Sequence, residues 1–327
     1  MAAKEATVAL VRTRPETVLA DYARLLRAAG VPAAVAPGSR VAFCLDLEPD
    51  GRAANLPPAV APPWLLEGVA RSLLAQGWSA ADLSLIVPGR PAPALPLSWR
   101  RVISGCGIAP AQSREQMPAA PPSAVLLSSL TTHRWLGIAG SLGTLAAHLL
   151  PPADRLALDR QPTRLSEAWQ RQGRVAVGGA VIDATICGAG PDRRRLLPLA
   201  AHVLVGGQDP VAVDAIAASL IGFTPLQLPL LRAAHAAGLG CADPARIRLV
   251  GDRIDAWPLL DLRAAAGYRG PRAAEPARWS RLFTARWPRV AWTLRAARRQ
   301  RQRFAATAWG RLYDHYERPE QSAQGQP

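Results

Sequence analysis

Apolar and polar stretches follow one another along the chain in the order expected for strands that alternate with helices. Residues 6–12 are an almost continuous apolar run, which predicts a short buried strand. Residues 16–30 then carry apolar side chains at helical spacing, and Gly30 is suited to end that helix. A strand followed by an amphipathic helix and another strand is typical of a sheet with parallel strands.

The same alternation continues to residue 252. Further strands are expected within residues 37–49, 82–89, 123–130, 174–191, 200–207 and 245–252, the last of them on an edge of the sheet. Further helices are expected within residues 62–78, 132–150 and 206–222. The pattern therefore predicts an α/β fold, with a mostly parallel or mixed sheet flanked by helices.

Composition separates this predicted domain, residues 1–268, from a different C-terminal segment. Prolines cluster at residues 118–122, so the domain could consist of two lobes with a break near residues 97–122. Residues 269–318 are rich in arginine and tryptophan and are expected to form a basic helical tail. The last residues, 319–327, are expected to be a disordered end.

The tail carries most of the charge. Thirteen arginines face three acidic residues there, so the tail holds ten of the fifteen net positive charges of the chain. Residues 274–318 place aromatic side chains among these arginines at helical spacing, which suits an anionic membrane surface or an acidic protein partner. The alternative is that the aromatic side chains pack on the domain. Nucleic acid ranks last as a partner, because no recognised nucleic-acid motif accompanies the charge.

Several classes of protein are not favoured by the sequence. The four cysteines lie far apart and form no CxxC pair, so neither a zinc ribbon nor an iron–sulfur motif is predicted. Charged residues interrupt the N-terminal segment, which lacks the apolar core of a secretion signal. We therefore expect a cytoplasmic protein, with peripheral attachment to a membrane through the tail as an alternative.

Two aspartates stand out in the apolar residues 206–222. Asp209 precedes Pro210 at the start of the predicted helix, where a carboxylate can cap free backbone N–H groups. Asp214 lies on the inner face of the same helix, which is otherwise apolar. A buried carboxylate costs about 1–3 kcal/mol unless it is compensated, so Asp214 needs a hydrogen-bond donor, a cation or a raised pKa.

Asp183 is a similar anomaly within an apolar strand. If Asp183 and Asp209 both lie near the ends of their strands, their carboxylates meet at one edge of the sheet, where open α/β sheets bind ligands. Gly188 and Gly190 follow in a turn that allows close approach of the backbone, and Arg193 comes next. Glycine N–H groups beside arginines can hold an anion. The alternative is a tight turn with solvated arginines.

These segments resemble a family known as domain of unknown function 362. The resemblance rests on the stretches GGQDPVAVDAIAASLIGFTP, VIDATICGAGP and LTTHRWLGIAGSLG, and it covers residues 6–252. The matching positions are Asp183, Gly190, Pro191, Asp209, Pro210, Ala212, Asp214, Gly222 and His133. Many relatives carry ferredoxin-like cysteine motifs, so the resemblance implies redox chemistry for the family.

This chain departs from the family pattern where the family has basic residues. Residues 44–46 read Cys-Leu-Asp where the family typically has Lys-Pro-Asn, and Thr131 stands in the place of a lysine. Residues 140–141 replace a later Lys-Asn pair, and the ferredoxin-like cysteine motifs are missing. The carboxylates are kept while the cations are absent, so the resemblance alone assigns no reaction to this chain.

A candidate site follows from these residues. We predict that a small anionic ligand or a metal ion binds at an aspartate-lined sheet edge, in a protein that acts in a redox or cofactor pathway. The candidates for catalytic roles are His133, Asp183 and Asp214, and those for binding a ligand or cofactor are Gly188, Gly190, Arg193 and Asp209. The sequence names no cofactor, and His202 is expected in the core of its strand. The competing interpretation is a non-catalytic scaffold that acts through the basic tail.

Overall fold

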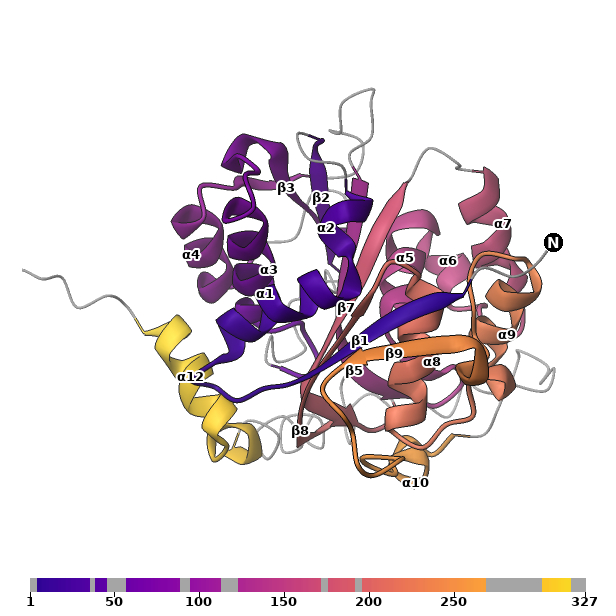
Figure 1. The fold of residues 1–327 in the computed structure, drawn as a ribbon. Coiled ribbons are helices and arrows are strands. Elements are labelled where there is room, and N and C mark those ends of the chain that lie inside the picture. Colours follow the sequence, from indigo (N-terminus) through magenta and orange to yellow (C-terminus); the bar gives the residue numbers. More distant parts are fainter. Residues whose placement is uncertain are drawn as a thin grey trace, which may run out of the picture.

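The computed structural model describes the sheet, its helices and the end of the tail. The described residues are 5–35, 39–45, 57–88, 95–112, 123–171, 176–191, 196–268 and 302–318. Within them, nine strands form one sheet with helices on both faces (Figure 1). The fold is therefore α/β, which confirms the prediction from the hydrophobic pattern.

The sheet is mixed rather than parallel throughout. Its strands are β1 (Ala6–Arg12), β2 (Val41–Leu45), β3 (Leu83–Ile86), β4 (Ala109–Gln112), β5 (Ser123–His133), β6 (Gly137–Ala139), β7 (Val177–Ala189), β8 (Leu197–Gly207) and β9 (Ile247–Gly251). Their order is β4-β3-β2-β5-β7-β8-β1-β9, and β6 pairs with β5 beside this path. β8 is antiparallel to both of its neighbours and β6 to β5, whereas the other neighbouring pairs are parallel.

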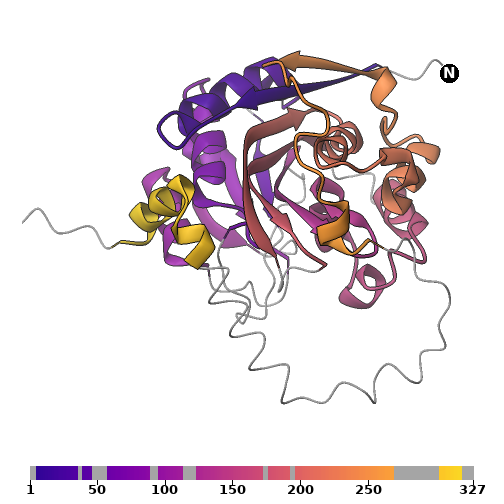
Figure 2. The ribbon, with the colours of Figure 1, turned by 90° about the horizontal axis from the view of Figure 1, so that it is seen from below.

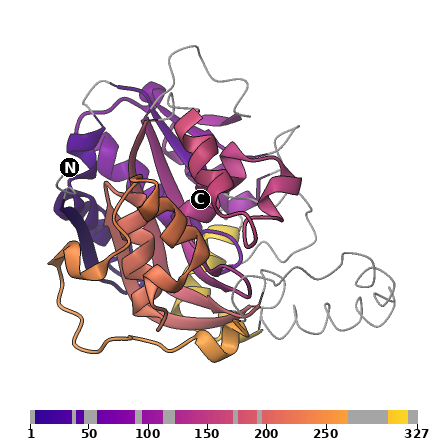
Figure 3. The ribbon, with the colours of Figure 1, turned by 90° about the vertical axis from the view of Figure 1, so that its right-hand side faces the viewer.

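Helices cover both faces because the side chains of each strand alternate between them. The first face is covered by α1 (Val18–Ala29), α2 (Val31–Ala34), α3 (Pro63–Leu74), α4 (Leu97–Gly105) and α12 (Ala308–Glu317). The second face is covered by α5 (Ser141–Leu149), α7 (Thr163–Arg171), α8 (Pro210–Leu220), α9 (Pro229–Ala236) and α10 (Arg263–Ala266), while α6 (Pro152–Arg155) follows α5 and has no buried residue. Figure 2 shows the two groups of helices after a 90° turn, and Figure 3 views the molecule from the side of α7 and α9.

Strand β1 illustrates how one sheet serves two cores. Ala9 and Val11 belong to the core under the first group of helices, whereas Val8 and Leu10 belong to the core under the second group. Helix α1 follows this strand and ends at Gly30, whose φ of 66° is the left-handed conformation expected for a glycine at a helix end. The predicted strand and helix at the start of the chain are both present.

Residues 97–112 correct the expected break between two lobes. They form α4 and β4, and β4 pairs with β3 in the same sheet. Strand β2 in turn pairs with both β3 and β5, so the strands before and after this segment share one sheet. Residues 113–122 lie outside the described residues.

The described end of the tail packs on the domain. Phe304, Trp309 and Tyr313 are buried, and the Trp309 ring lies 5.5 Å from the Trp64 ring of α3. The tail therefore ends in a helical extension, while residues 269–301 lie outside the part that the structure describes. Among the described helices, none has both the length and the apolar character needed to cross a bilayer.

Candidate functional site

Asp183 lies in the middle of β7 and points to the first face of the sheet, between α1 and α3. It is 1% exposed. Tyr22 Oη donates a hydrogen bond to Asp183 Oδ2 at 2.5 Å, and Trp64 Nε1 donates to the same oxygen at 2.9 Å. The backbone N–H and the hydroxyl of Thr185 donate to Oδ1 at 2.8 and 2.5 Å. We call Asp183, Tyr22, Trp64 and Thr185 the Asp183 cluster.

The donors of the Asp183 cluster explain why a carboxylate is tolerated in an apolar strand. Burial raises the pKa of Asp183, and the hydrogen bonds from Thr185, Tyr22 and Trp64 lower it again. Burial and the neighbouring carboxylate raise the pKa of Tyr22 well above its usual range, so its hydroxyl keeps the proton that it donates. Both carboxylate oxygens have partners within the chain, and Asp183 thereby fixes α1 and α3 on the sheet.

Asp214 lies in α8, on the second face of the sheet. Its carboxylate accepts the backbone N–H groups of Ser141 at 2.7 Å and Leu142 at 2.9 Å, which are the first residues of α5. These N–H groups have no partner within their own helix, so Asp214 caps α5 from a neighbouring helix. Gly140 allows this approach, because a Cβ there would lie 2.7 Å from Asp214 Oδ1. Burial raises the pKa of Asp214 to about 6, although the two N–H groups act in the opposite direction.

Asp209 caps α8, the role that its position before Pro210 indicates. Its Oδ1 accepts the backbone N–H groups of Val211 at 2.9 Å and Ala212 at 3.1 Å. Its Oδ2 accepts the N–H of Cys241 at 2.8 Å, which ties the start of α8 to a loop later in the chain. Burial raises the pKa of Asp209, and these three hydrogen bonds oppose that effect.

The structure corrects the predicted aspartate-lined edge of the sheet. β7 and β8 are antiparallel, so the end of β8 lies beside the beginning of β7. Asp209 follows β8, whereas Gly188 is near the end of β7. The two residues therefore lie at opposite ends of this pair of strands. Asp183 and Asp214 are separated in another way, because they lie on opposite faces of the sheet. Asp209 and Asp214 belong to the same helix, but each of the three carboxylates accepts hydrogen bonds from a different part of the chain. The aspartates predicted to form one site therefore act as structural anchors.

His133, Gly188 and Gly190 do come together, at the carboxyl ends of β5 and β7. The hydroxyl of Thr132 accepts the N–H of Gly190 at 2.7 Å and donates to the Gly190 carbonyl at 2.6 Å. Nδ1 of His133 accepts two backbone N–H groups of its own turn at 3.3 and 3.2 Å. The contacts of Thr132 join the ends of the two strands, whereas those of His133 lie within its own turn. Arg193 lies outside the described residues.

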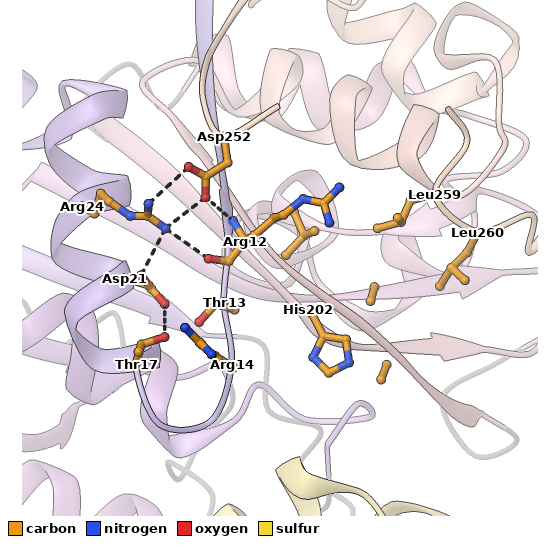
Figure 4. Close-up of a pocket in the computed structure, with 13 residues that line it drawn as sticks. Arg12, Thr13, Arg14, Thr17, Asp21, Arg24, His202, Asp252, Leu259 and Leu260 are labelled. Atoms are coloured by element: carbon orange, nitrogen blue, oxygen red, sulfur yellow. Dashed lines mark hydrogen bonds and ion pairs between the residues drawn. The ribbon is translucent and has the colours of Figure 1, made fainter. Parts of the chain in front are cut away.

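A cavity of about 910 Å³ lies at the carboxyl end of β1 (Figure 4). Its walls come from the loop after β1, from α1, from β8 and from the segments that follow β9. β1 and β9 are parallel neighbours, and open α/β sheets bind ligands outside the carboxyl ends of such strands. The lining residues are Arg12, Thr13, Arg14, Thr17, Asp21, Arg24, Ala200, Ala201, His202, Val203, Asp252, Leu259 and Leu260. We call this cavity the Arg12 pocket.

His202 contributes to the Arg12 pocket because β8 contains a bulge there. Two residues of β8, Ala201 and His202, lie opposite the single residue Thr185 of β7. His202 has a φ of 56°, a left-handed conformation that costs a non-glycine residue about 1–2 kcal/mol. Bulges beside functional sites redirect side chains, and the side chain of His202 is exposed. The expectation that His202 lies in the core is therefore wrong.

Carboxylates hold two of the three arginines that line the Arg12 pocket. Arg24 Nη2 lies 3.2 Å from Asp21 and 3.0 Å from Asp252. Arg12 Nη2 lies 3.2 Å from Asp255, and the side chains of this pair are 52% and 78% exposed. Solvent screens such an exposed pair, so Arg12 is held less firmly than Arg24.

Arg14 and Thr13, two neighbouring residues of the Arg12 pocket, have side-chain groups without a partner of the expected kind within the described ranges. Among the described residues, no carboxylate pairs with the exposed Arg14. Thr13 is only 6% exposed, and its hydroxyl has no hydrogen-bond partner in the part of the chain that the structure describes. A buried polar group without a partner costs about 1–3 kcal/mol. The lining of this cavity thus includes a guanidinium without a carboxylate partner and a buried hydroxyl without a hydrogen-bond partner in the described part of the chain.

The Arg12 pocket was not predicted from the sequence, although part of its signal is present there. Arg12, Thr13 and Arg14 directly follow the first predicted strand, and polar residues at such a strand end are a common mark of a ligand site in α/β folds. The bulge that redirects His202 has no comparable signal, because neither glycine nor asparagine occupies the left-handed position.

The described residues give no indication of a metal centre. Within them, no group of three or more His, Cys, Asp or Glu side chains is placed to hold a metal ion. Cys44, Cys106, Cys187 and Cys241 are buried thiols, and burial raises the pKa of Cys187 above its ordinary value.

Comparison with known proteins adds no further constraint. No family model, curated protein sequence or solved structure matches the chain significantly. The resemblance to domain of unknown function 362 stays a prediction from the sequence, and the candidate site rests on the geometry of the chain itself.

Proposed function

We propose that the chain binds a small organic anion in the Arg12 pocket. The observation that carries the proposal is the presence, in one cavity, of two adjacent residues with open polar groups. Arg14 has no carboxylate partner among the described residues, and the Thr13 hydroxyl is buried without a hydrogen-bond partner there. A carboxylate or phosphate oxygen would satisfy both groups at once, since guanidinium and hydroxyl groups both donate to such oxygens.

The charge of the lining supports an anion rather than a cation. Three arginines face two aspartates around the Arg12 pocket, and both aspartates are engaged with Arg24. Arg14 and the weakly held Arg12 therefore supply positive charge that no carboxylate of the lining neutralises. A ligand with one or two negative charges would complete this arrangement.

The other wall of the Arg12 pocket supports a ligand with an apolar part. Leu259 and Leu260 lie across the cavity from Arg24 (Figure 4), and Ala200, Ala201 and Val203 also line it. A volume of about 910 Å³ is within the range of cavities that hold small organic molecules. The site thus combines an anion-binding end with an apolar end.

Isothermal titration calorimetry with benzoate, phenyl phosphate and benzyl alcohol tests the proposal. The three probes share a ring and differ in charge. We expect the two anions to bind and the neutral alcohol to give no measurable heat. The absence of binding by both anions, or equal binding of the alcohol, would overturn the proposal.

Arg14→Gln is the variant that locates the site. It removes a charged donor, so the affinity for the anions should fall by roughly 10-fold, the effect of one charge-assisted hydrogen bond. Arg246→Gln is the matched control, because Arg246 is exposed and does not line the cavity. Equal loss of affinity in both variants would show that net charge, and not this pocket, attracts the anion.

The described part of the tail does not favour a second function as a membrane-binding element. Phe304, Trp309 and Tyr313 are buried against the domain, so these aromatic side chains are not presented to a bilayer. Residues 274–301, which carry most of the predicted basic and aromatic surface, lie outside the described residues.

A further inference from the structure

We infer that Trp309, in helix α12, is a positioning residue of the Arg12 pocket. Trp309 sets the tautomer of His202 and thereby determines which hydrogen bond His202 offers to a ligand. This inference rests on the proposed function, since it concerns the same pocket. It also assigns a role to the end of the tail, where aromatic residues stand among the arginines.

The contact that carries the inference joins residues 107 positions apart. Trp309 Nε1 donates a hydrogen bond to His202 Nδ1 at 3.1 Å, and the two rings lie 5.9 Å apart between centroids. The indole N–H can only donate, so Nδ1 of His202 must accept and carries no proton. The proton of the imidazole is then on Nε2, and Nε2–H is the donor left to face a ligand.

The backbone of His202 is already fixed, so the ring is the part that Trp309 controls. The bulge in β8 sets the left-handed φ of His202, and the His202 carbonyl accepts the N–H of Thr13 at 2.9 Å. This backbone hydrogen bond places His202 beside Thr13 in the lining of the pocket. Rotation of the ring is what remains free, and the bond from Trp309 removes that freedom.

Trp309 is itself held in place by the domain. It is fully buried, and its ring packs 5.5 Å from that of Trp64, whose Nε1 donates to Asp183 at 2.9 Å. The helix of Trp309 is anchored at its end by Tyr316, whose hydroxyl donates to Glu67 of α3. The Asp183 cluster is therefore linked to the pocket by a chain of contacts, from Asp183 to Trp64, from Trp64 to Trp309 and from Trp309 to His202.

The fixed tautomer makes His202 a donor toward the cavity. Together with Arg14 and Thr13, it gives three donors around the open end of the Arg12 pocket, which matches the several acceptor oxygens of a carboxylate or phosphate. A ligand that offers only donors would find no acceptor on His202, because Nδ1 is occupied by Trp309. The C-terminal helix thus contributes to ligand selection without lining the cavity.

The tautomer can be measured in the ligand-free protein by ¹⁵N NMR of labelled imidazole side chains. We expect wild-type His202 to carry its proton on Nε2, with a scalar coupling across the hydrogen bond from Trp309 Nε1 to Nδ1. A proton on Nδ1 of wild-type His202 would overturn the inference. This measurement needs no ligand, so it is independent of whether the anion-binding proposal holds, and it requires no variant to fold.

Two variants then connect the tautomer to binding. Trp309→Phe keeps an aromatic ring but removes the donor, so both tautomers should be populated and benzoate affinity should fall by roughly 5-fold, the effect of one hydrogen bond. Trp99→Phe, the same change at a buried tryptophan of α4, is the matched control and should alter neither. Unchanged affinity in Trp309→Phe, or an equal loss in Trp99→Phe, would contradict a positioning role.

Discussion

The Asp183 cluster and the Arg12 pocket both contain charged and hydroxyl side chains. In the cluster these groups are hydrogen-bonded to one another, whereas the pocket contains polar groups without such a partner in the described part of the chain. Both draw on α1, where adjacent residues diverge: Tyr22 belongs to the cluster and Asp21 lines the pocket. In the cluster, four hydrogen bonds from within the chain surround one carboxylate. In the pocket, no carboxylate of the described residues pairs with the Arg14 guanidinium, and the Thr13 hydroxyl has no hydrogen-bond partner among them.

This difference shows how to interpret a buried charge. A carboxylate in an apolar strand needs compensation, but compensation from neighbouring side chains makes it a structural element. A functional site is better indicated by polar groups that the fold holds in position without giving them a hydrogen-bond partner. By this criterion Asp183, Asp209 and Asp214 are anchors, and the groups at the end of β1 are candidates for ligand binding.

The largest effect that separates the two regions is expected from Asp183→Ala. The change leaves the buried donors of Tyr22, Trp64 and Thr185 without an acceptor, so the free energy of unfolding should fall by at least about 3 kcal/mol. Urea denaturation measures this loss. A decrease below about 1 kcal/mol would show that the cluster contributes little to stability and that Asp183 is free for another role.

Asp214 should give a pH-dependent effect of up to about 3 kcal/mol. Its pKa in the folded protein is about 6, above the ordinary 3.8, so the folded state binds the proton more tightly. The stability that this carboxyl contributes is therefore complete below pH 4 and is lost as the pH rises through about 6.

The difference in unfolding free energy between wild type and Asp214→Asn isolates this contribution from other titrating groups. Measured by urea denaturation from pH 4 to pH 7.5, the wild type should lose stability relative to the variant as the pH rises. A relative gain with rising pH would mean that the two N–H groups of α5 outweigh burial and hold the pKa below its ordinary value.

Thr13→Val should have a smaller effect, with an unchanged or higher free energy of unfolding but a lower affinity for the ligand. Valine has the shape of threonine without the unpartnered hydroxyl, so the unfolding free energy should stay the same or rise by up to about 1 kcal/mol. The affinity for benzoate should fall by roughly 5-fold, because the ligand loses a donor. A loss of stability would indicate that the hydroxyl has a structural partner, which would weaken its assignment to the pocket.

Much of the fold could be predicted from the sequence, because the hydrophobic pattern marks elements that are buried on one face or on both. Strand β1 has the predicted bounds of residues 6–12, and Asp209 with Pro210 marks the start of α8. The predicted site is misplaced because β8 runs antiparallel to β7. Residues 190–196 connect β7 to β8 and are too few for a parallel crossover, which needs a dozen or more residues, so the length of this connection indicates the antiparallel direction.

Other parts of the site depend on tertiary contacts that local sequence does not encode. The sequence predicts that Asp214 needs a hydrogen-bond donor, a cation or a raised pKa, but not where a donor comes from. The structure shows a raised pKa and donors at the start of α5, of which Ser141 lies 73 positions earlier in the chain. The hydrogen bond between Trp309 and His202 joins residues 107 positions apart. This contact follows from the packing of α12 on the domain, and the pattern of the tail alone indicates that packing only as one of its alternatives.

We propose that the chain binds its ligand in the Arg12 pocket, at the carboxyl end of β1, and not at the buried aspartates. Titration of ¹⁵N-labelled protein with benzoate, with the amide chemical-shift changes mapped onto the structure, distinguishes the two locations. We expect the changes to centre on Thr13, Arg14 and His202. Changes centred on Asp183 or Asp214, with the loop after β1 unaffected, would contradict the claim.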